Sequence, residues 1–154
     1  MINQTTKILR DLDVINGREI YLYGCLFMCL AWTTDRTRIT PELILTWFKA
    51  SKTRGIIGEM ARVKSFADLL ALMGSPFVYA SRRVLDGAND IRLQNNELGI
   101  VRWATGNNGT HFTVYANVKG IAVEVYDPFS KLDEDVRYDI KRTKADRIDI
   151  LRII

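Results

Sequence analysis

The chain has 154 residues, of which 47% are hydrophobic and 26% are charged. This length suits one domain with a substantial hydrophobic core, and the composition excludes a largely disordered chain. The formal net charge is +4, but basic and acidic residues are interleaved and no stretch forms a basic arm. We therefore expect residues 1–154 to form a single domain, and we expect no nucleic-acid partner.

The N-terminal part of the sequence bears on the cellular compartment. Residues 1–10 are polar and lack the apolar run of a signal peptide. The most apolar segment, 20–32, is too short to span a bilayer and is followed by charges. The two cysteines, Cys25 and Cys29, do not form the pattern of a disulfide framework. These features predict a cytoplasmic protein without a membrane span.

Helix signals come first along the chain. Residues 25–33 are apolar nearly all round, which predicts a buried helix, and Tyr23-Gly24 would form the turn into it. Thr40 is a good N-cap and Pro41 suits the first helical position, so a second helix is expected over 40–51.

A third helix is expected where Ser65 and Asp68 have the spacing of a capping box, and Gly74 would end it. After Gly74 the pattern becomes typical of strands. Strands are predicted over 77–80, 98–104, 111–117, 121–126 and 148–154. Segment 81–97 is expected to be a surface loop or short helix, and 133–144 a solvated connection. Helices followed by strands predict an α+β fold, with a helical N-terminal half packed on an antiparallel C-terminal sheet.

Cys25 stands at the start of the first predicted helix. A helix N-terminus carries roughly half a unit of positive charge, which stabilises a thiolate. Cys29 follows four residues later on the same helix face and is expected to pack one turn deeper. A buried cysteine is more often a small core residue than a nucleophile, so Cys25 alone does not predict catalysis.

The only histidine, His111, opens a predicted strand after the loop 106–109, a position where folds often present functional side chains. Residues 118–120 suit a three-residue hairpin loop with glycine in the left-handed position. That loop would place His111 opposite Asp127. Opposite side chains on one sheet face have β-carbons about 4.5–5.5 Å apart, so the hairpin predicts a His–Asp pair that a slip of one residue would break.

In chain order, Cys25, His111 and Asp127 supply a nucleophile, a base and an orienting carboxylate. In this respect the chain resembles the papain-like cysteine peptidases, whose nucleophile begins a central helix and whose His and Asn or Asp come from the sheet. The closer similarity is to the bacteriocin-leader-processing (double-glycine) peptidases. The residues that carry it, within roughly 20–130, are Tyr23-Gly24-Cys25, Thr40-Pro41-Glu42-Leu43, Gly109-Thr110-His111-Phe112-Thr113-Val114 and Val123-Glu124-Val125-Tyr126-Asp127-Pro128.

This resemblance implies a thiol hydrolase that cleaves an amide bond in a peptide, a protein or a cell-wall peptide, without a metal or an organic cofactor. The chain departs from the family pattern at two places. Residues 26–28 are Leu-Phe-Met where the family has Gly-Pro or a small polar residue, and no glutamine precedes Cys25 to donate to the oxyanion hole. We expect Asn16 or Tyr21 to replace that donor, together with the backbone N–H of Cys25.

Three alternatives compete with this interpretation. A zinc site made from Cys25, Cys29, His111 and Asp127 would have a wider cysteine spacing and fewer Cys or His ligands than structural zinc sites. A redox pair is disfavoured because the spacing is Cys-x-x-x-Cys. The strongest alternative is a papain-like fold that has lost efficient catalysis and binds a peptide or a partner protein. The missing glutamine favours it, whereas the retained Cys, His and Asp favour an enzyme.

Overall fold

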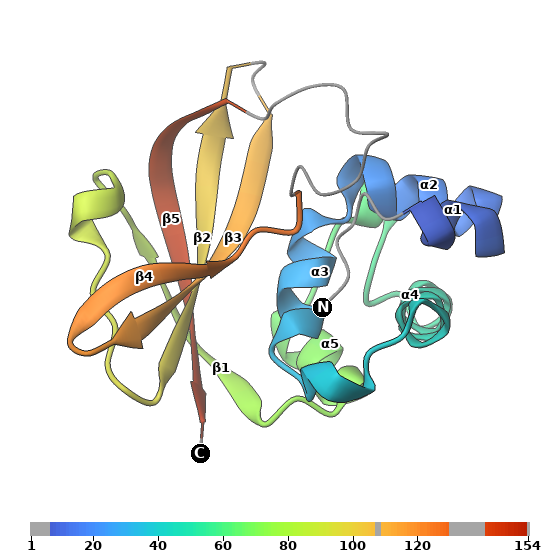
Figure 1. Ribbon diagram of the computed structural model, residues 1–154, viewed down its shortest axis with the longest axis horizontal. Coiled ribbons are helices and arrows are strands. Elements are labelled where there is room, and N and C mark those ends of the chain that lie inside the picture. Colours follow the sequence, from blue (N-terminus) through green and yellow to red (C-terminus); the bar gives the residue numbers. More distant parts are fainter. Residues whose placement is uncertain (1–6, 107–108, 130–140, 154) are drawn as a thin grey trace.

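A computed structural model describes residues 7–106, 109–129 and 141–153. Over these residues the chain is α+β, with five α-helices before a five-stranded antiparallel sheet, which confirms the predicted class. The helices lie together beside the sheet (Figure 1). Helix α3 (Cys25–Trp32) is the helix nearest the sheet, and it packs along β3 (Thr110–Val118).

Two of the remaining helices, α4 (Pro41–Thr53) and α5 (Phe66–Met73), follow the local signals of the sequence, whereas α1 (Lys7–Leu12) and α2 (Val14–Tyr23) were not predicted. The Thr40 hydroxyl accepts from the Leu43 N–H at 3.1 Å, and the Ser65 hydroxyl accepts from the Asp68 N–H at 3.1 Å, as N-caps do. Gly74 ends its helix in the left-handed conformation, with φ of 67°. Short 3-10 turns lie at Arg36–Arg38, Glu59–Ala61 and Ala88–Asp90.

Helices α2 and α3 meet at Gly24 and change direction there (Figure 1). The Gly24 N–H donates to the Ile20 carbonyl at 2.8 Å, and the Gly24 carbonyl accepts from the Met28 N–H at 2.9 Å. A β-carbon on Gly24 would lie 2.6 Å from the Ile20 carbonyl oxygen, so only glycine fits this junction. The N–H groups in the first turn of α3, beginning with that of Cys25, have no acceptor within their own helix.

The sheet has the strand order β1-β5-β2-β3-β4, so β1 and β4 form its two edges. The strands besides β3 are β1 (Phe77–Val84), β2 (Glu97–Thr105), β4 (Ile121–Tyr126) and β5 (Arg142–Ile153). The expected strands over 98–104, 111–117 and 121–126 are confirmed. The expected loop at 81–97 is wrong at both ends, because β1 continues to Val84 and β2 begins at Glu97. The expected connection over 133–144 is wrong at its end, because β5 begins at Arg142; residues 133–140 and 154 lie outside the described part of the chain.

The β3–β4 hairpin differs from the predicted register. Val118 pairs with Ile121, so the loop has two residues, Lys119 and Gly120, instead of three. Both loop residues have positive φ, 54° and 86°. Two-residue hairpin turns whose twist matches that of the flanking strands require this conformation. The pairing along the hairpin is therefore displaced by one residue from the predicted one.

A second shift in the pairing returns the side chains at the end of β4 to the face of the sheet that the sequence predicted. The pairing moves by one more residue between Tyr115 and Val114, and this leaves Val125 as the extra residue of a β-bulge. Two displacements of one residue add up to two, the side-chain period of a strand. If the pairing continued past the end of β4, Asp127 would lie opposite Thr113, diagonal to His111 and on the same face.

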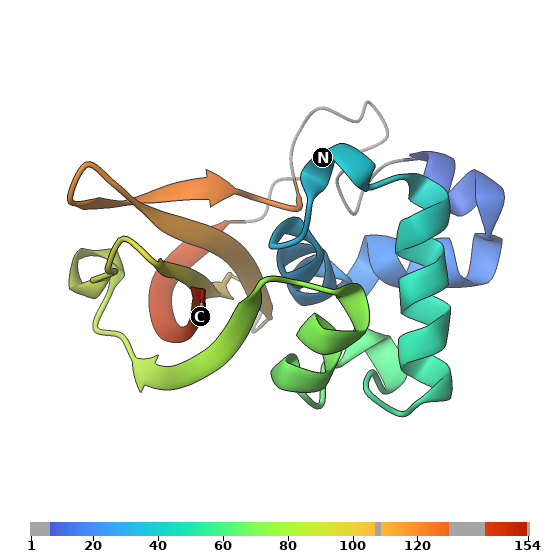
Figure 2. The same ribbon diagram turned by 90° about the horizontal axis from the view of Figure 1, so that it is seen from below.

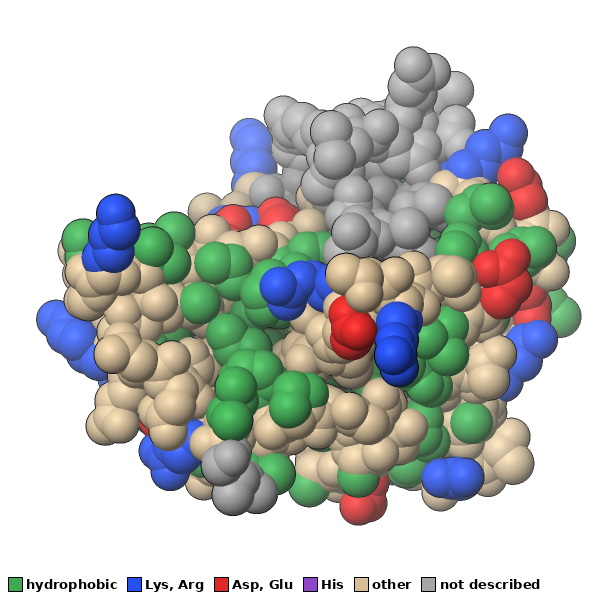
Figure 3. Space-filling model, turned by 60° about the horizontal axis from the view of Figure 1, so that its bottom comes forward, with side chains coloured by type: hydrophobic (Ala, Val, Ile, Leu, Met, Phe, Trp, Pro, Cys, Tyr) green, Lys and Arg blue, Asp and Glu red, His purple; other side chains and the backbone are tan. Residues whose placement is uncertain are grey.

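Two groups of buried side chains stabilise the fold. The larger group lies between the helices and the sheet and includes Phe27 and Phe48, whose rings meet edge to face at 5.2 Å. The smaller lies on the other side of the sheet, which curls around it (Figure 2), and comprises Leu85, Ile91, Val101, Ala145, Ile148 and Ile150. On the face shown in Figure 3, a band of hydrophobic side chains runs between the sheet half and the helical half.

Candidate active site

The two cysteines occupy different environments on α3. Cys25, the first residue of the helix, is half-buried, whereas Cys29 is completely buried one turn later. The Cys29 thiol donates to the Phe112 carbonyl at 3.4 Å. Burial raises the pKa of Cys29 well above its usual value, and the nearby charge of Cys25 adds to this effect. Cys29 therefore stays a neutral thiol, which leaves Cys25 as the candidate nucleophile.

The imidazole of His111 is held by Asp127. His111 Nε2 lies 2.7 Å from Asp127 Oδ1, and only 1% of His111 is exposed. The contact that the sequence predicted is thus present, although it is a diagonal contact at the end of the hairpin and not a direct cross-strand pair. The ring of Phe129 packs edge-on against the imidazole, with ring centroids 6.3 Å apart. Because Nε2 is bound to the carboxylate, Nδ1 is the ring nitrogen left for a thiol.

The charges of Cys25, His111 and Asp127 are coupled. Burial alone would lower the pKa of His111, but its hydrogen bonds with Asp127 and Cys25, and their charges, outweigh burial and raise it to about 9. Burial would raise the pKa of Asp127, but the hydrogen bond and charge of His111 outweigh it and lower that pKa. At neutral pH the imidazole is therefore positively charged, which is the state that stabilises a thiolate next to it.

Two further residues, Arg142 and Glu124, belong to this cluster, and the sequence analysis did not predict either of them as part of the site. Arg142, at the start of β5, binds Asp127 Oδ2 through Nη2 and donates to Glu124 Oε1 through Nη1 at 2.6 Å. Its guanidinium carbon lies 5.0 Å from the centre of the Trp103 ring. Arg142 falls within the charge-dense segment that was expected to be solvated, and no local pattern connects it to Asp127.

The two expected oxyanion donors have different positions. Asn16 donates its side-chain amide to Asp13 at 2.9 Å and lies eight residues, roughly 12 Å along a helix, before Gly24. This placement argues against Asn16 as a donor. Tyr21 precedes Cys25 by one helical turn, and its ring centroid is 6.5 Å from that of Phe129, so Tyr21 borders the site.

Glu19 occupies the region where the family pattern would have its glutamine. Its carboxylate binds the Lys52 ammonium at 2.5 Å and accepts from the Ala61 N–H at 3.0 Å. Ala61 has φ of 52°, a left-handed conformation that this hydrogen bond helps to hold. Glu19 therefore links α2 to the turn at Glu59–Ala61 through this hydrogen bond. Its carboxylate is not available as an oxyanion donor.

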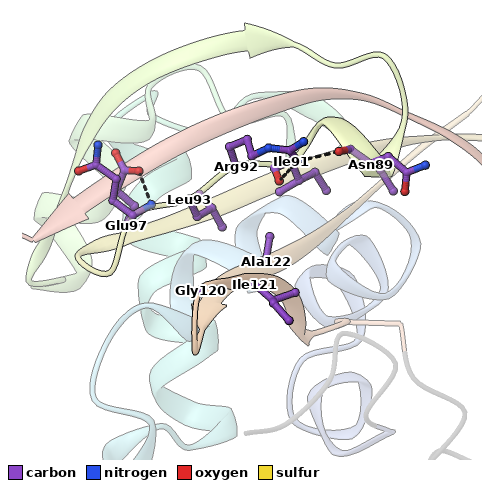
Figure 4. Close-up of a pocket in the computed structure, with 10 residues that line it drawn as sticks. Asn89, Ile91, Arg92, Leu93, Glu97, Gly120, Ile121 and Ala122 are labelled. Atoms are coloured by element: carbon purple, nitrogen blue, oxygen red, sulfur yellow. Dashed lines mark hydrogen bonds between the residues drawn. The ribbon is translucent and has the colours of Figure 1, made fainter.

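A pocket of about 550 Å³ lies elsewhere, between the segment that leads into β2 and the β3–β4 turn (Figure 4). Its lining residues are Ala88, Asn89, Ile91, Arg92, Leu93, Gln94, Glu97, Gly120, Ile121 and Ala122. Neither cysteine borders it, nor does His111 or Asp127. Glu97 already accepts from the Gln94 N–H at 2.9 Å and pairs with Arg152 at 2.7 Å. The candidate site is therefore the side-chain cluster around His111, and this pocket is separate from it.

Comparisons of the chain with protein-family models, with curated proteins and with solved structures find no match. Within residues 7–106, 109–129 and 141–153, no three His, Cys, Asp or Glu side chains are grouped to hold a metal ion. Over the same residues, no helix is long and apolar enough to cross a membrane. The interpretation of the site rests on its geometry and charges.

Proposed function

We propose that this protein is a thiol hydrolase of the papain-like kind, which cleaves an amide bond in a peptide, a protein or a cell-wall peptide. Cys25 is the nucleophile, His111 the general base and acid, and Asp127 the residue that orients His111. The observation that carries the proposal is the buried His111 imidazole, which binds Asp127 at 2.7 Å and lies close enough to Cys25 for both side chains to raise its pKa. A cysteine, its base and an orienting group within mutual reach are the arrangement that nucleophilic catalysis needs.

The first half of the reaction follows from these roles. The Cys25 thiolate attacks the carbonyl carbon of the substrate amide, and a new C–S bond forms. The negative charge on the carbonyl oxygen is stabilised by the backbone N–H of Cys25 at the start of α3, with Tyr21 as the candidate second donor. The C–N bond then breaks, and the proton on His111 Nδ1 passes to the leaving amine.

The second half regenerates the enzyme. The neutral His111 takes a proton from a water molecule, which attacks the carbonyl carbon of the thioester. The C–S bond breaks, the acid product leaves, and the pair of Cys25 thiolate and His111 imidazolium forms again. Asp127 remains ionised throughout, and it keeps the ring in the tautomer that presents Nδ1 to the sulfur.

A peptidyl chloromethyl ketone tests the proposal, because such a compound alkylates a cysteine that has an active catalytic base. We expect a covalent adduct on Cys25, located by peptide mass spectrometry. Cys25→Ala should form no adduct, and Cys29→Ala is the matched control that removes the other thiol and should still form it. Turnover of peptide and cell-wall peptide substrates should likewise depend on Cys25.

The same experiment decides between the enzyme and the binding module. Wild-type protein that is folded by circular dichroism but forms no Cys25 adduct would support a papain-like fold that binds a peptide or partner without cleaving it. In that case Cys25→Ala should leave partner affinity nearly unchanged, because binding would depend on the walls of the site and not on the sulfur.

A further inference from the structure

The carboxylate of Asp127 is shared between two cations. Oδ1 accepts from His111 Nε2 at 2.7 Å and from the Phe129 N–H at 2.9 Å. Oδ2 accepts from Arg142 Nη2. Both oxygens are thus held, and the guanidinium competes with the imidazolium for one negative charge. A simple His–Asp pair would leave that charge to the imidazolium alone.

Arg142 is itself held in place from two sides. Its two terminal nitrogens bind the Glu124 carboxylate at 2.6 and 3.2 Å, the bidentate geometry in which arginine is most strongly oriented. Trp103 packs against the guanidinium, and the Trp103 indole N–H donates to the Thr113 hydroxyl at 2.9 Å. Only 24% of the Arg142 side chain is exposed, so water screens these contacts incompletely.

We propose that Arg142 is a positioning residue of the candidate active site: held by Glu124, it binds one oxygen of Asp127 and thereby limits how strongly that carboxylate holds the His111 proton. This inference rests on the proposed function for its catalytic meaning. Its other part does not depend on catalysis: Arg142 on β5 reduces the effect of the Asp127 carboxylate on the pKa of His111 on β3.

The charges around His111 indicate the direction of the effect. The titratable and charged groups near the cluster include Cys25 and Cys29 from α3, Tyr115 from β3, Glu124 and Tyr126 from β4, Asp127, and Arg142 from β5. Tyr21 of α2 also borders the site, with the Arg10 guanidinium over its ring at 4.5 Å. Of these groups, Arg142 is the cation besides His111 that binds Asp127. Removing its charge should strengthen the hold of Asp127 on the imidazolium, whereas neutralising Glu124 should leave Arg142 freer to weaken it.

This control matters because His111 must lose its proton in each catalytic cycle. An imidazolium held too strongly by a carboxylate forms a stable ion pair with the thiolate but is a poor acid toward the leaving amine. Sharing Asp127 with Arg142 keeps the carboxylate ionised and in place while making the imidazolium more acidic. Arg142 thus acts through Asp127, without touching the reacting atoms.

NMR titration of the imidazole tests the inference directly, because His111 is the only histidine and its ε1 signal needs no separation from others. We expect Arg142→Met to raise the pKa of His111 by about one unit and Glu124→Gln to lower it by a smaller amount. Arg142→Lys keeps the positive charge and should return the pKa most of the way to the wild-type value.

Arg102→Met is the matched control. Arg102 is similarly half-buried, with 31% of its side chain exposed, and it pairs at 2.7 Å with Asp146, whereas Asp127 pairs with His111 and Arg142. This variant should leave the His111 titration unchanged. An unchanged or lowered pKa of His111 in folded Arg142→Met would overturn the inference, as would changes of the same sign in Arg142→Met and Glu124→Gln.

The two proposals fail separately. One outcome is that the titrations shift as expected while the folded wild type forms no adduct with the chloromethyl ketone. In that case Arg142 does position Asp127, and the proposed thiol hydrolase activity is wrong. If the adduct forms and the titrations do not shift, the hydrolase stands and Arg142 is only a structural ion pair.

Discussion

The two cysteines of α3 show what the fold does to chemically identical groups one helical turn apart. Cys25 lies at the helix start, half-buried and beside a charged imidazole, whereas Cys29 is enclosed by apolar side chains and donates to a backbone carbonyl. Both belong to the same short apolar sequence. The difference teaches that two cysteines on one helix can have different environments, because the sheet brings His111 and Asp127 to the helix end and apolar side chains to the next turn.

The largest expected contrast is in native alkylation. Iodoacetamide should modify Cys25 at least about a thousandfold faster than Cys29, because Cys29 reacts only after the core has opened. Quantitative mass spectrometry of native protein measures the two rates, and the difference should disappear in urea. Faster modification of Cys29 in the folded protein would reverse the assignment of the nucleophile.

Removal of the His111 imidazole should reduce the difference in alkylation rate between Cys25 and Cys29. His111→Gln deletes the cation that stabilises the Cys25 thiolate, so alkylation of Cys25 at pH 7 should slow by on the order of tenfold to a hundredfold. Alkylation of Cys29 should change only if the fold is destabilised, which makes it an internal control. Equal effects on both thiols would mean that His111 supports the structure and not the sulfur.

The charge of His111 also links stability to pH. Its pKa is about 9 in the folded protein and near 6.5 when unfolded, so its stabilising contribution is complete below pH 6.5 and is lost as pH rises through 9. For the proton on His111 alone this amounts to about 2 kcal/mol of unfolding free energy between pH 6.5 and 8.5, and the proton that the proposed Cys25 thiolate has given up opposes it. Urea unfolding at several pH values measures it, and His111→Gln should remove the dependence in that window. Above about pH 9, Cys29 adds a further loss because its pKa is also raised.

The smallest effect concerns packing. Cys29→Ala should cost about 1–2 kcal/mol, because it leaves a small cavity and a Phe112 carbonyl without its donor. Cys25→Ala should cost less than about 1 kcal/mol, because the half-buried site can admit water. Chemical denaturation of both variants gives the comparison. A larger cost at position 25 would contradict the separation of a reactive cysteine from a packing one.

Much of the fold could be predicted because its signals are local. Thr40, Ser65 and Gly74 mark helix ends through hydrogen bonds to residues only three or four positions away. The boundaries of β5 could not be predicted in the same way. Its first half is polar because its side chains form ion pairs with neighbouring strands, such as Arg102 with Asp146, and a pattern of charges resembles that of a solvated loop.

The candidate site was predictable in part for the same reason. His111 and Asp127 lie on one hairpin, where a periodicity of two residues constrains which side chains share a face. The predicted register was wrong because neither the two-residue turn nor the bulge at Val125 has an unambiguous sequence signal. Arg142 and Glu124 lie on β5 and β4, which β2 and β3 separate in the sheet, so no local pattern could predict their contact. Nor did any sequence pattern indicate that the Asn16 amide binds Asp13.

Strand β4, which leads into Asp127, is also an edge of the sheet, and this has a consequence for the protein in concentrated solution. Ile121 and Val123 are 66% and 40% exposed, and the one charged side chain of the strand, Glu124, is turned toward Arg142. Proteins usually discourage pairing between molecules by placing lysine, proline or other charges along such an edge. Residues 121–126 contain no lysine or proline, so self-association should begin at β4 and, since β4 ends at the site, should slow the labelling of Cys25 as protein concentration rises.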